Sequence, residues 1–184
     1  LHTAYRRQRQ MCIRDRQFLG DVFWGDLDVL LLDLPPGTGD IAISIAQLIP
    51  NSEILVVTTP QQAAAEVAER AGSIAMQTHQ RLVGVIENMS WLELPDGSRQ
   101  ELFGAGGGQS VADSLTRTVG ADVPLLGQIP LDVSLREGSD QGAPAVLSNP
   151  DGPAAVALRG IARGLATRSR GLAGRSLGLT PTGR

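Results

Sequence analysis

The sequence contains no lysine, because all 16 of its basic residues are arginine. A phosphate-binding loop of the G-x-x-x-x-G-K-[ST] type, and any reaction that runs through a lysine amine, are therefore excluded for these residues. Cysteine is almost as rare: Cys12 is the only one, so one chain can form neither an internal disulfide nor a cysteine-only metal site. Aromatic residues make up 3%, so the core must be built from Ala, Val, Leu and Ile.

Long apolar runs and a secretory leader pattern are also missing. The longest apolar runs are well below the roughly 18–20 residues that a membrane helix needs, and no charged-then-apolar leader pattern opens the sequence. These absences predict a cytoplasmic protein with no membrane partner. The residues that are present, 42% hydrophobic and 19% charged in a chain of 184, are typical of one globular domain.

The net charge of -3 hides an uneven distribution. Residues 1–16 carry +4 and residues 163–184 carry +5, whereas residues 17–162 carry -12. An acidic body argues against nucleic acid as a partner. Solvated, poorly ordered tails are the simpler explanation of the basic ends, and contact with phosphates is the alternative.

Three segments differ in composition. Residues 1–16 show no periodicity and are interpreted as a leader that is non-native or disordered, so Cys12 is given no function. Residues 17–166 carry the regular patterns and are predicted to form the folded part. Residues 167–184 combine Gly, Arg, Ser and Thr without a pattern, which predicts a disordered tail.

Apolar runs alternate with helical patterns through the central segment. Continuous apolar runs bounded by Pro, Gly or Asn predict buried strands at 27–33, 53–59, 81–89 and 124–130. A small hairpin is predicted at 91–103, and helices at 41–49 (with Asp40 as N-cap), 61–79, 109–119, 132–138 and 153–166. This alternation predicts an α/β fold, a mostly parallel sheet flanked by helices, with ligands at the carboxyl ends of the strands.

The first predicted strand ends in Asp33 and is followed by a Pro-Pro-Gly loop that contains Gly37. Four apolar residues before an aspartate form a Walker B pattern, whose carboxylate lies beside a nucleotide-bound Mg²⁺, usually through a water molecule. Gly37 would let a backbone N–H approach a γ-phosphate closely. An ordinary strand end followed by a Pro-Gly turn is the alternative interpretation.

Five strings, in this order, carry a family resemblance: DVLLLDLPPGTGDIAISIAQLIP, VVTTPQQAAAEVAERA, GVIENMS, FGAGGG and PLLGQIPLD. Over residues 17–166 they resemble the Mrp/ApbC family of deviant-Walker P-loop ATPases, which are related to MinD and the nitrogenase iron protein. The resemblance implies a SIMIBI-type P-loop NTPase fold and a homodimer with ATP and Mg²⁺ between its subunits. It also implies an iron–sulfur cluster that is assembled or transferred to apo iron–sulfur proteins.

The resemblance also implies roles for individual residues. Asp33 corresponds to the Walker B aspartate that holds Mg²⁺ through water, and Gly37 belongs to switch II. Asn88 corresponds to the residue that reads adenine, and Pro130 and Asp132 fall where the family packs the purine ring. From the residues alone, Asn88 is also consistent with a turn at a strand end, and Pro130 and Asp132 with a strand-to-helix turn in which Asp132 is the N-cap.

The sequence departs from the family pattern in two places. The family's glycine-rich loop with two lysines, expected well upstream of Asp33, is not present. The chain is therefore expected to be a carboxyl-terminal fragment that lacks the P-loop strand and helix and does not by itself hydrolyse ATP at a useful rate. The family's Cys-x-x-Cys aligns with Leu94 and Gly97, which cannot bind iron, so the cluster is either held by other means or lost.

Other features of the sequence are consistent with a structural role. The glycine run at 104–108 is predicted to be a close-packed loop, with a phosphate nest or a dimer contact as the alternative. His79 is predicted to be a surface residue. The expected function is that of a fragment of a cluster-carrier ATPase, and a non-catalytic scaffold of the same fold is the alternative. A MinD/ParA-like membrane ATPase is disfavoured, because glycines and Pro181 interrupt any amphipathic helix in 164–184.

Overall fold

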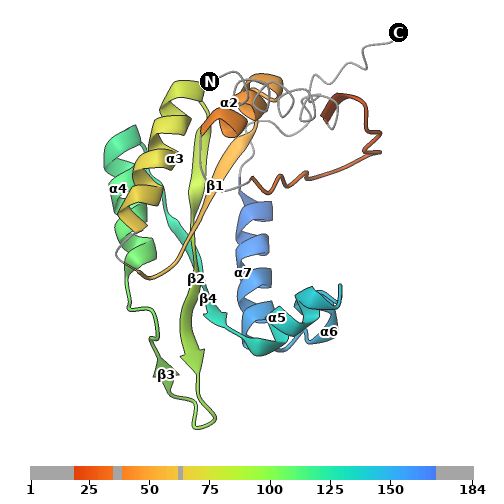
Figure 1. Ribbon diagram of the computed structural model, residues 1–184, viewed down its shortest axis with the longest axis vertical. Helices are drawn as coiled ribbons and strands as arrows, with labels where there is room; N and C mark the ends of the chain where they lie inside the picture. The colour runs from red at the N-terminus through yellow and green to blue at the C-terminus, as the bar shows by residue number, and fades with distance from the viewer. Residues whose placement is uncertain (1–18, 35–38, 62–63, 169–184) are drawn as a thin grey trace, which may run out of the picture.

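The computed structural model describes residues 19–34, 39–61 and 64–168. Strand β2 is the centre of the sheet (Figure 1): β1 and β4 pair with it in parallel, and β3 pairs antiparallel with its carboxyl-terminal end. The predicted α/β fold with a mostly parallel sheet is confirmed. The elements in chain order are α2 (Gly39–Leu48), β1 (Glu53–Thr58), α3 (Ala64–Thr78), β2 (Arg81–Glu93), β3 (Arg99–Gln100), α4 (Gly107–Val119), β4 (Leu125–Leu131), α5 (Val133–Asp140), α6 (Ala145–Ser148) and α7 (Pro153–Thr167).

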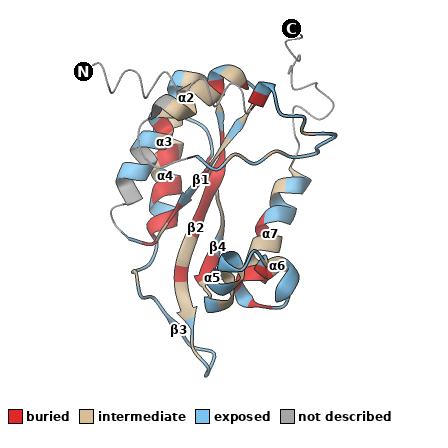
Figure 2. Cartoon of the chain, turned by 45° about the vertical axis from the view of Figure 1, so that its right-hand side comes forward, coloured by how far each residue is buried: buried red, intermediate tan, exposed pale blue. Residues whose placement is uncertain are grey.

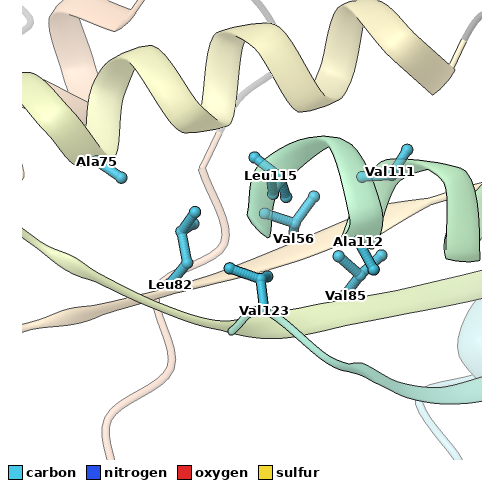
Figure 3. Packing of buried hydrophobic residues seen from close by; sticks show 8 residues of the cluster. All are labelled: Val56, Ala75, Leu82, Val85, Val111, Ala112, Leu115 and Val123. Carbon is cyan, nitrogen blue, oxygen red and sulfur yellow. The ribbon is translucent and has the colours of Figure 1, made fainter. Parts of the chain in front are cut away.

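Helices cover both faces of the sheet (Figure 1). Helices α3 and α4 cover one face through a buried aliphatic cluster (Figure 3), and α7 covers the other face. Val85 and Ile86 are neighbours in β2 and belong to opposite faces, because side chains alternate along a strand. The first cluster contains Val56, Ala75, Leu82, Val85, Val111, Ala112, Leu115 and Val123, and the second contains Ile86, Ile129, Ala154 and Ile161.

A β-bulge interrupts this alternation in the first half of β2. Leu82 and Val85 face the same helices although they are three residues apart, because the register of β2 against β1 shifts there. Gly84 lies at the bulge, and a Cβ on it would come within 2.7 Å of the Pro124 carbonyl oxygen. The same carbonyl accepts a hydrogen bond of 2.9 Å from the Val85 N–H, so the glycine allows β4 to begin close against β2.

The strand predicted at 27–33 is not formed in this structure. None of the described strands pairs with this segment, which has no regular secondary structure, and the side chains of Val29 and Leu31 are 52% and 80% exposed. A strand buried on both faces needs hydrogen-bonded neighbours and covering helices, and the described residues supply neither to this segment. Figures 1 and 2 show it toward the end of the sheet where the strands begin.

The other elements lie close to their predicted positions. Helix α2 begins at Gly39, one residue before the predicted N-cap Asp40, and β2 continues four residues beyond the predicted end, to Glu93. The short helix α6 was not predicted. The predicted leader, residues 1–16, and residues 169–184 of the predicted tail lie outside the described residues. None of the helices in the described ranges is long and apolar enough to cross a membrane.

Candidate functional site

The carboxyl ends of β2 and β4 bring three of the predicted site residues to one edge of the sheet. The parallel register places Asn88 opposite Ile129, the residue before Pro130, and Asp132 directly follows the end of β4. Pro130 is buried, whereas Asn88 and Asp132 are half-buried. The three residues therefore lie at the same end of the sheet, the carboxyl end of its strands, where ligands were predicted to bind.

Asn88 lies at the start of a register irregularity between β2 and β4. Its side-chain Oδ1 accepts a hydrogen bond of 2.9 Å from the Met89 N–H, and Met89 has the left-handed backbone conformation, with φ of 57°. The buried Ser90 hydroxyl donates to the Glu87 carbonyl oxygen at 3.1 Å, across the same irregular stretch of β2. Because a backbone N–H can only donate, the accepting atom of Asn88 is its oxygen, and the Nδ2 group is the donor that remains.

Asp132 caps two helices at once. Its Oδ1 accepts from the Ser134 N–H at 2.8 Å and from the Ser134 hydroxyl at 2.6 Å, and its Oδ2 accepts from the Ala154 N–H at 3.4 Å, in the first turn of α7. Burial raises the pKa of this carboxyl, but the hydrogen bonds from Ser134 and Ala154 outweigh it, so the pKa is lowered. The predicted N-cap is confirmed.

Glu87 is a site feature that the sequence analysis missed. The side chain is 1% exposed, its Oε2 accepts from the Gly108 N–H at 2.6 Å, and its Oε1 accepts from Gln128 Nε2 at 2.7 Å. The carboxylate therefore lies at the amino terminus of α4, where the helix dipole favours a negative charge. A signal was present, since an acidic residue inside an otherwise apolar strand needs a buried partner.

The glycine run forms the loop that meets this carboxylate. A Cβ on Gly107 would lie 2.5 Å from the Pro60 carbonyl oxygen, and one on Gly108 would lie 2.7 Å from Glu87 Cβ. Gly106 precedes α4 with φ of 79°. This is the predicted close-packed loop. A phosphate nest is disfavoured, because Glu87 already occupies the anion-binding end of α4.

The two predicted catalytic residues are not part of this edge. Asp33 is exposed and lies in the unpaired segment 19–34, which Figures 1 and 2 show away from the carboxyl ends of β2 and β4. Gly37 lies outside the described residues. Their roles in Mg²⁺ binding and switching stay predictions. They require residues 27–33 to join the sheet as a parallel strand, because only then does Asp33 lie at the same edge as Asn88.

The hairpin after Ser90 does not fit an iron–sulfur cluster. Leu94 and Gly97, at the positions of the family's cysteines, lie in a turn that is closed by backbone hydrogen bonds. The Gly97 N–H donates to the Leu94 carbonyl oxygen, and the Leu94 N–H donates to the Ser98 carbonyl oxygen. Asp96 accepts from the Ser98 N–H and hydroxyl, which lowers the pKa of its carboxyl. Among the described residues, no group of three or more His, Cys, Asp or Glu could hold a metal ion.

Arg99 closes the base of the same hairpin. Its guanidinium carbon lies 4.1 Å from the ring centroid of Trp91, a cation–π contact across the two strands. Figure 2 shows the hairpin projecting from the sheet with its tip coloured as exposed. The hairpin is thus stabilised by contacts among its own residues. Its polar groups are oxygens and a guanidinium, and it contains no thiolate that could bind iron.

Comparison with known families identifies the chain. A model described as NUBPL iron-transfer P-loop NTPase, of the ParA group, matches residues 9–166. The chain belongs to this family. The resemblance to Mrp/ApbC ATPases inferred from the sequence is thereby confirmed.

Relatives and solved structures agree with this family. The iron-sulfur cluster carrier protein of Mycobacterium tuberculosis is 70% identical over 169 residues, which cover 92% of this chain and 44% of the relative. The protein of the same name from Deinococcus radiodurans is 45% identical over 152 residues, 82% of this chain and 41% of the relative. The chain thus spans less than half the length of these curated relatives.

Two solved structures share the fold. A nucleotide-binding protein from Archaeoglobus fulgidus, in complex with ADP, has a TM-score of 0.63 and 36% identity over 78% of this chain and 56% of that chain. The septum site-determining protein MinD from Pyrococcus horikoshii, complexed with Mg-ADP, has a TM-score of 0.60 at 24% identity over 91% of this chain and 58% of that chain, which shows the fold alone. The P-loop NTPase fold predicted from the sequence is confirmed.

Proposed function

We propose that this chain is the carboxyl-terminal part of an ATP-binding and ATP-hydrolysing iron–sulfur cluster carrier. The longer protein would assemble clusters or transfer them to apo iron–sulfur proteins, as a homodimer in the cytoplasm. The observation that carries the proposal is the 70% identity, across 92% of this chain, to a protein named as an iron-sulfur cluster carrier. The cluster is cargo in this proposal, and the apo-proteins are its recipients.

The nucleotide site is proposed at the carboxyl ends of β2 and β4. Asn88 Nδ2 would donate to the edge of the adenine ring, and Pro130 would pack against its face. Asp33 would hold Mg²⁺ through water, and Gly37 would respond to the γ-phosphate. Bound Mg²⁺ would neutralise charge that develops on the phosphates. In support, Asn88 pairs with Ile129, the residue before Pro130, at the edge where α/β folds bind ligands.

A preceding segment of the longer protein is proposed to carry the phosphate-binding loop. The chain spans 44% of its relative from M. tuberculosis. None of the described strands pairs with the outer edge of β1, and Val57 on that strand is 55% exposed. Together with the apolar segment 27–33, in which only Leu30 and Leu32 are half-buried and the other residues are exposed, this is the surface expected where further strands join a sheet.

A non-catalytic scaffold is the second candidate function. Two observations favour it: the sequence contains no lysine, and the hairpin at Leu94 and Gly97 is closed by its own hydrogen bonds. The scaffold would keep the fold and its dimer surface without binding nucleotide or cluster. We prefer the carrier proposal, because the sheet edge with Asn88 and Pro130 is intact.

The first test is to sequence the source gene upstream of the Gln17 codon. An in-frame glycine-rich loop with lysines supports the carrier, and a start codon just upstream of Leu1 without such a loop supports the scaffold. The full-length product is then assayed for ATP hydrolysis and for ATP-dependent cluster transfer to an apo-ferredoxin. Asp33→Asn should abolish hydrolysis, whereas the matched control Asp26→Asn, in the same segment, should not change it.

A further inference from the structure

Glu87 is a buried carboxylate without a buried cation among the described residues. Both of its oxygens are hydrogen-bonded, to the Gly108 N–H and to Gln128 Nε2. Taking a carboxylate out of water is costly unless such donors replace the lost hydration. The 13-residue helix α4 supplies one of these donors, and its dipole also favours a negative charge at this end. The amino terminus of α4 therefore stabilises the Glu87 carboxylate.

The hydrogen bonds of the Glu87 side chain connect three elements of the fold, and Glu87 is the residue directly before Asn88. Strand β2 carries Glu87 itself, α4 contributes Gly108, and β4 contributes Gln128, which pairs with Glu87 in the sheet register. Gly108 has no room for a side chain because Glu87 Cβ fills that space. The Glu87 side chain is therefore held both by the amino terminus of α4 and by the neighbouring strand β4.

Met89, the residue that follows Asn88, constrains the orientation of the Asn88 side chain. Its left-handed conformation costs a residue with a side chain about 1–2 kcal/mol, and strain of this kind persists only where the surroundings impose it. The conformation turns the Met89 N–H toward Asn88 Oδ1. The described residues supply no hydrogen-bond acceptor for Asn88 Nδ2, so this group is the one presented at the edge of the sheet.

We propose that Glu87 and Met89 are positioning residues that hold the Asn88 amide with Nδ2 outward, ready to donate to an acceptor on the edge of a purine base. Glu87 fixes the strand against the glycine loop and β4, and Met89 sets the amide orientation. The proposal rests on the proposed nucleotide site and adds the device that orients its base-reading residue. In this proposal Glu87 and Met89 act only through Asn88 and do not themselves bind the nucleotide.

The first experiment tests the Glu87 network without any nucleotide, by NMR hydrogen exchange on the full-length gene product. In Glu87→Gln a neutral acceptor replaces the carboxylate, and the Gly108 amide proton should shift upfield and exchange about tenfold faster. The matched control is Glu93→Gln, the same substitution at an exposed position of the same strand, and it should leave Gly108 unchanged. An unchanged Gly108 signal in Glu87→Gln overturns the network.

The second experiment measures binding of a fluorescent ADP analogue and, by competition, of tripolyphosphate to the full-length gene product. Glu87→Gln should weaken ADP binding about tenfold, a change of about 1.4 kcal/mol, and leave tripolyphosphate binding unchanged. A merely structural lesion weakens both ligands. Met89→Gly, which tolerates a positive φ, should retain ADP binding, whereas the β-branched Met89→Val should lose it.

The outcomes separate the two proposals. If the wild-type full-length protein does not bind ADP, the proposed nucleotide site fails, and the exchange experiment alone decides whether Glu87 holds the glycine loop. If the wild type binds ADP and Asn88→Ala weakens binding but Glu87→Gln and Met89→Val do not, the site stands and the positioning proposal is overturned. Weakening by Glu87→Gln and Met89→Val, with Glu93→Gln and Met89→Gly unchanged, supports it.

Discussion

Residues 29–32 and residues 82–86 are both apolar runs, the second with one glycine, and they lie in different environments. Leu31 is 80% exposed and pairs with none of the described strands, whereas Val85 is 0% exposed and lies in the central strand of the sheet. The second run has β1 and β4 on its two edges and helices on its two faces. An apolar run therefore becomes a buried strand only where neighbours satisfy its backbone and cover its side chains.

The largest expected effect comes from shortening a buried leucine. Leu115→Ala should lower the free energy of unfolding by about 2–5 kcal/mol, because Leu115 is fully buried between α4 and the sheet. Leu31→Ala should change it by less than about 0.5 kcal/mol, as is usual for an exposed position. Urea denaturation of both variants measures the contrast. Equal losses would show that residues 29–32 are buried in solution.

A smaller contrast compares two glycines in helices. Gly108→Ala should destabilise the protein by about 1–3 kcal/mol, because the new Cβ would lie 2.7 Å from Glu87 Cβ. Gly160→Ala in α7 has nothing within 4 Å of the new Cβ and should stabilise the protein by about 0.5–1 kcal/mol. Thermal unfolding of the pair checks the signs. A neutral Gly108→Ala would contradict the close packing of the glycine loop.

The double cap at Asp132 predicts a pH-dependent contribution to stability. Asp132→Ala should cost about 1–2 kcal/mol at pH 7, where the carboxylate accepts from Ser134 and Ala154. Because the folded-state pKa is lowered below the value of 3.8, this stability is present above that pH and is lost as the pH falls through the folded pKa. Urea titrations at pH 7 and pH 3 measure it, with exposed Asp122→Ala as the control. A cost that grows at low pH would refute the cap.

Substitution of the exposed apolar residues near the start of the described chain should have the smallest effect on stability but should change self-association. We expect this chain to self-associate through its exposed apolar segment, in which Phe23 is 95% exposed. The double variant Phe23→Ser/Leu31→Ser should shift the protein toward monomer in light scattering while changing the unfolding free energy by less than about 0.5 kcal/mol. Glu101→Gln, at the opposite end of the sheet, is the control. A monodisperse monomeric wild type with a cooperative melt would contradict the expectation.

Much of the fold could be predicted from local patterns. Strands β1 and β4, the first part of β2 and the long helices follow from apolar runs bounded by Pro, Gly or Asn. The N-cap role of Asp132, one of the two interpretations that the sequence left open, depends on a local partner, because Ser134 is only two residues away. The short α6 has four residues and too little periodicity to be detected. The segment 27–33 was predicted to be a strand because it is apolar, but an apolar run in the sequence does not show whether neighbouring strands are available to pair with it.

The candidate site was predictable only in part, for the same reason. Asn88 and Pro130 could be placed together because the carboxyl ends of parallel strands share one edge. The partners of Glu87 could not be found, because Gly108 and Gln128 are 21 and 41 residues away in the chain. The orientation of the Asn88 amide depends on the φ of Met89, which no sequence pattern indicates for a methionine.

The measurement that tests the account most directly is hydrogen–deuterium exchange of residues 27–33 in the full-length gene product with Mg-ADP bound. We predict that the amides of residues 29–32 exchange as slowly there as those of β1, and rapidly in this chain alone. That result would place Asp33 at the end of a paired strand, on the same edge as Asn88. Rapid exchange in both proteins would contradict the account, because Asp33 could then not reach the proposed nucleotide site.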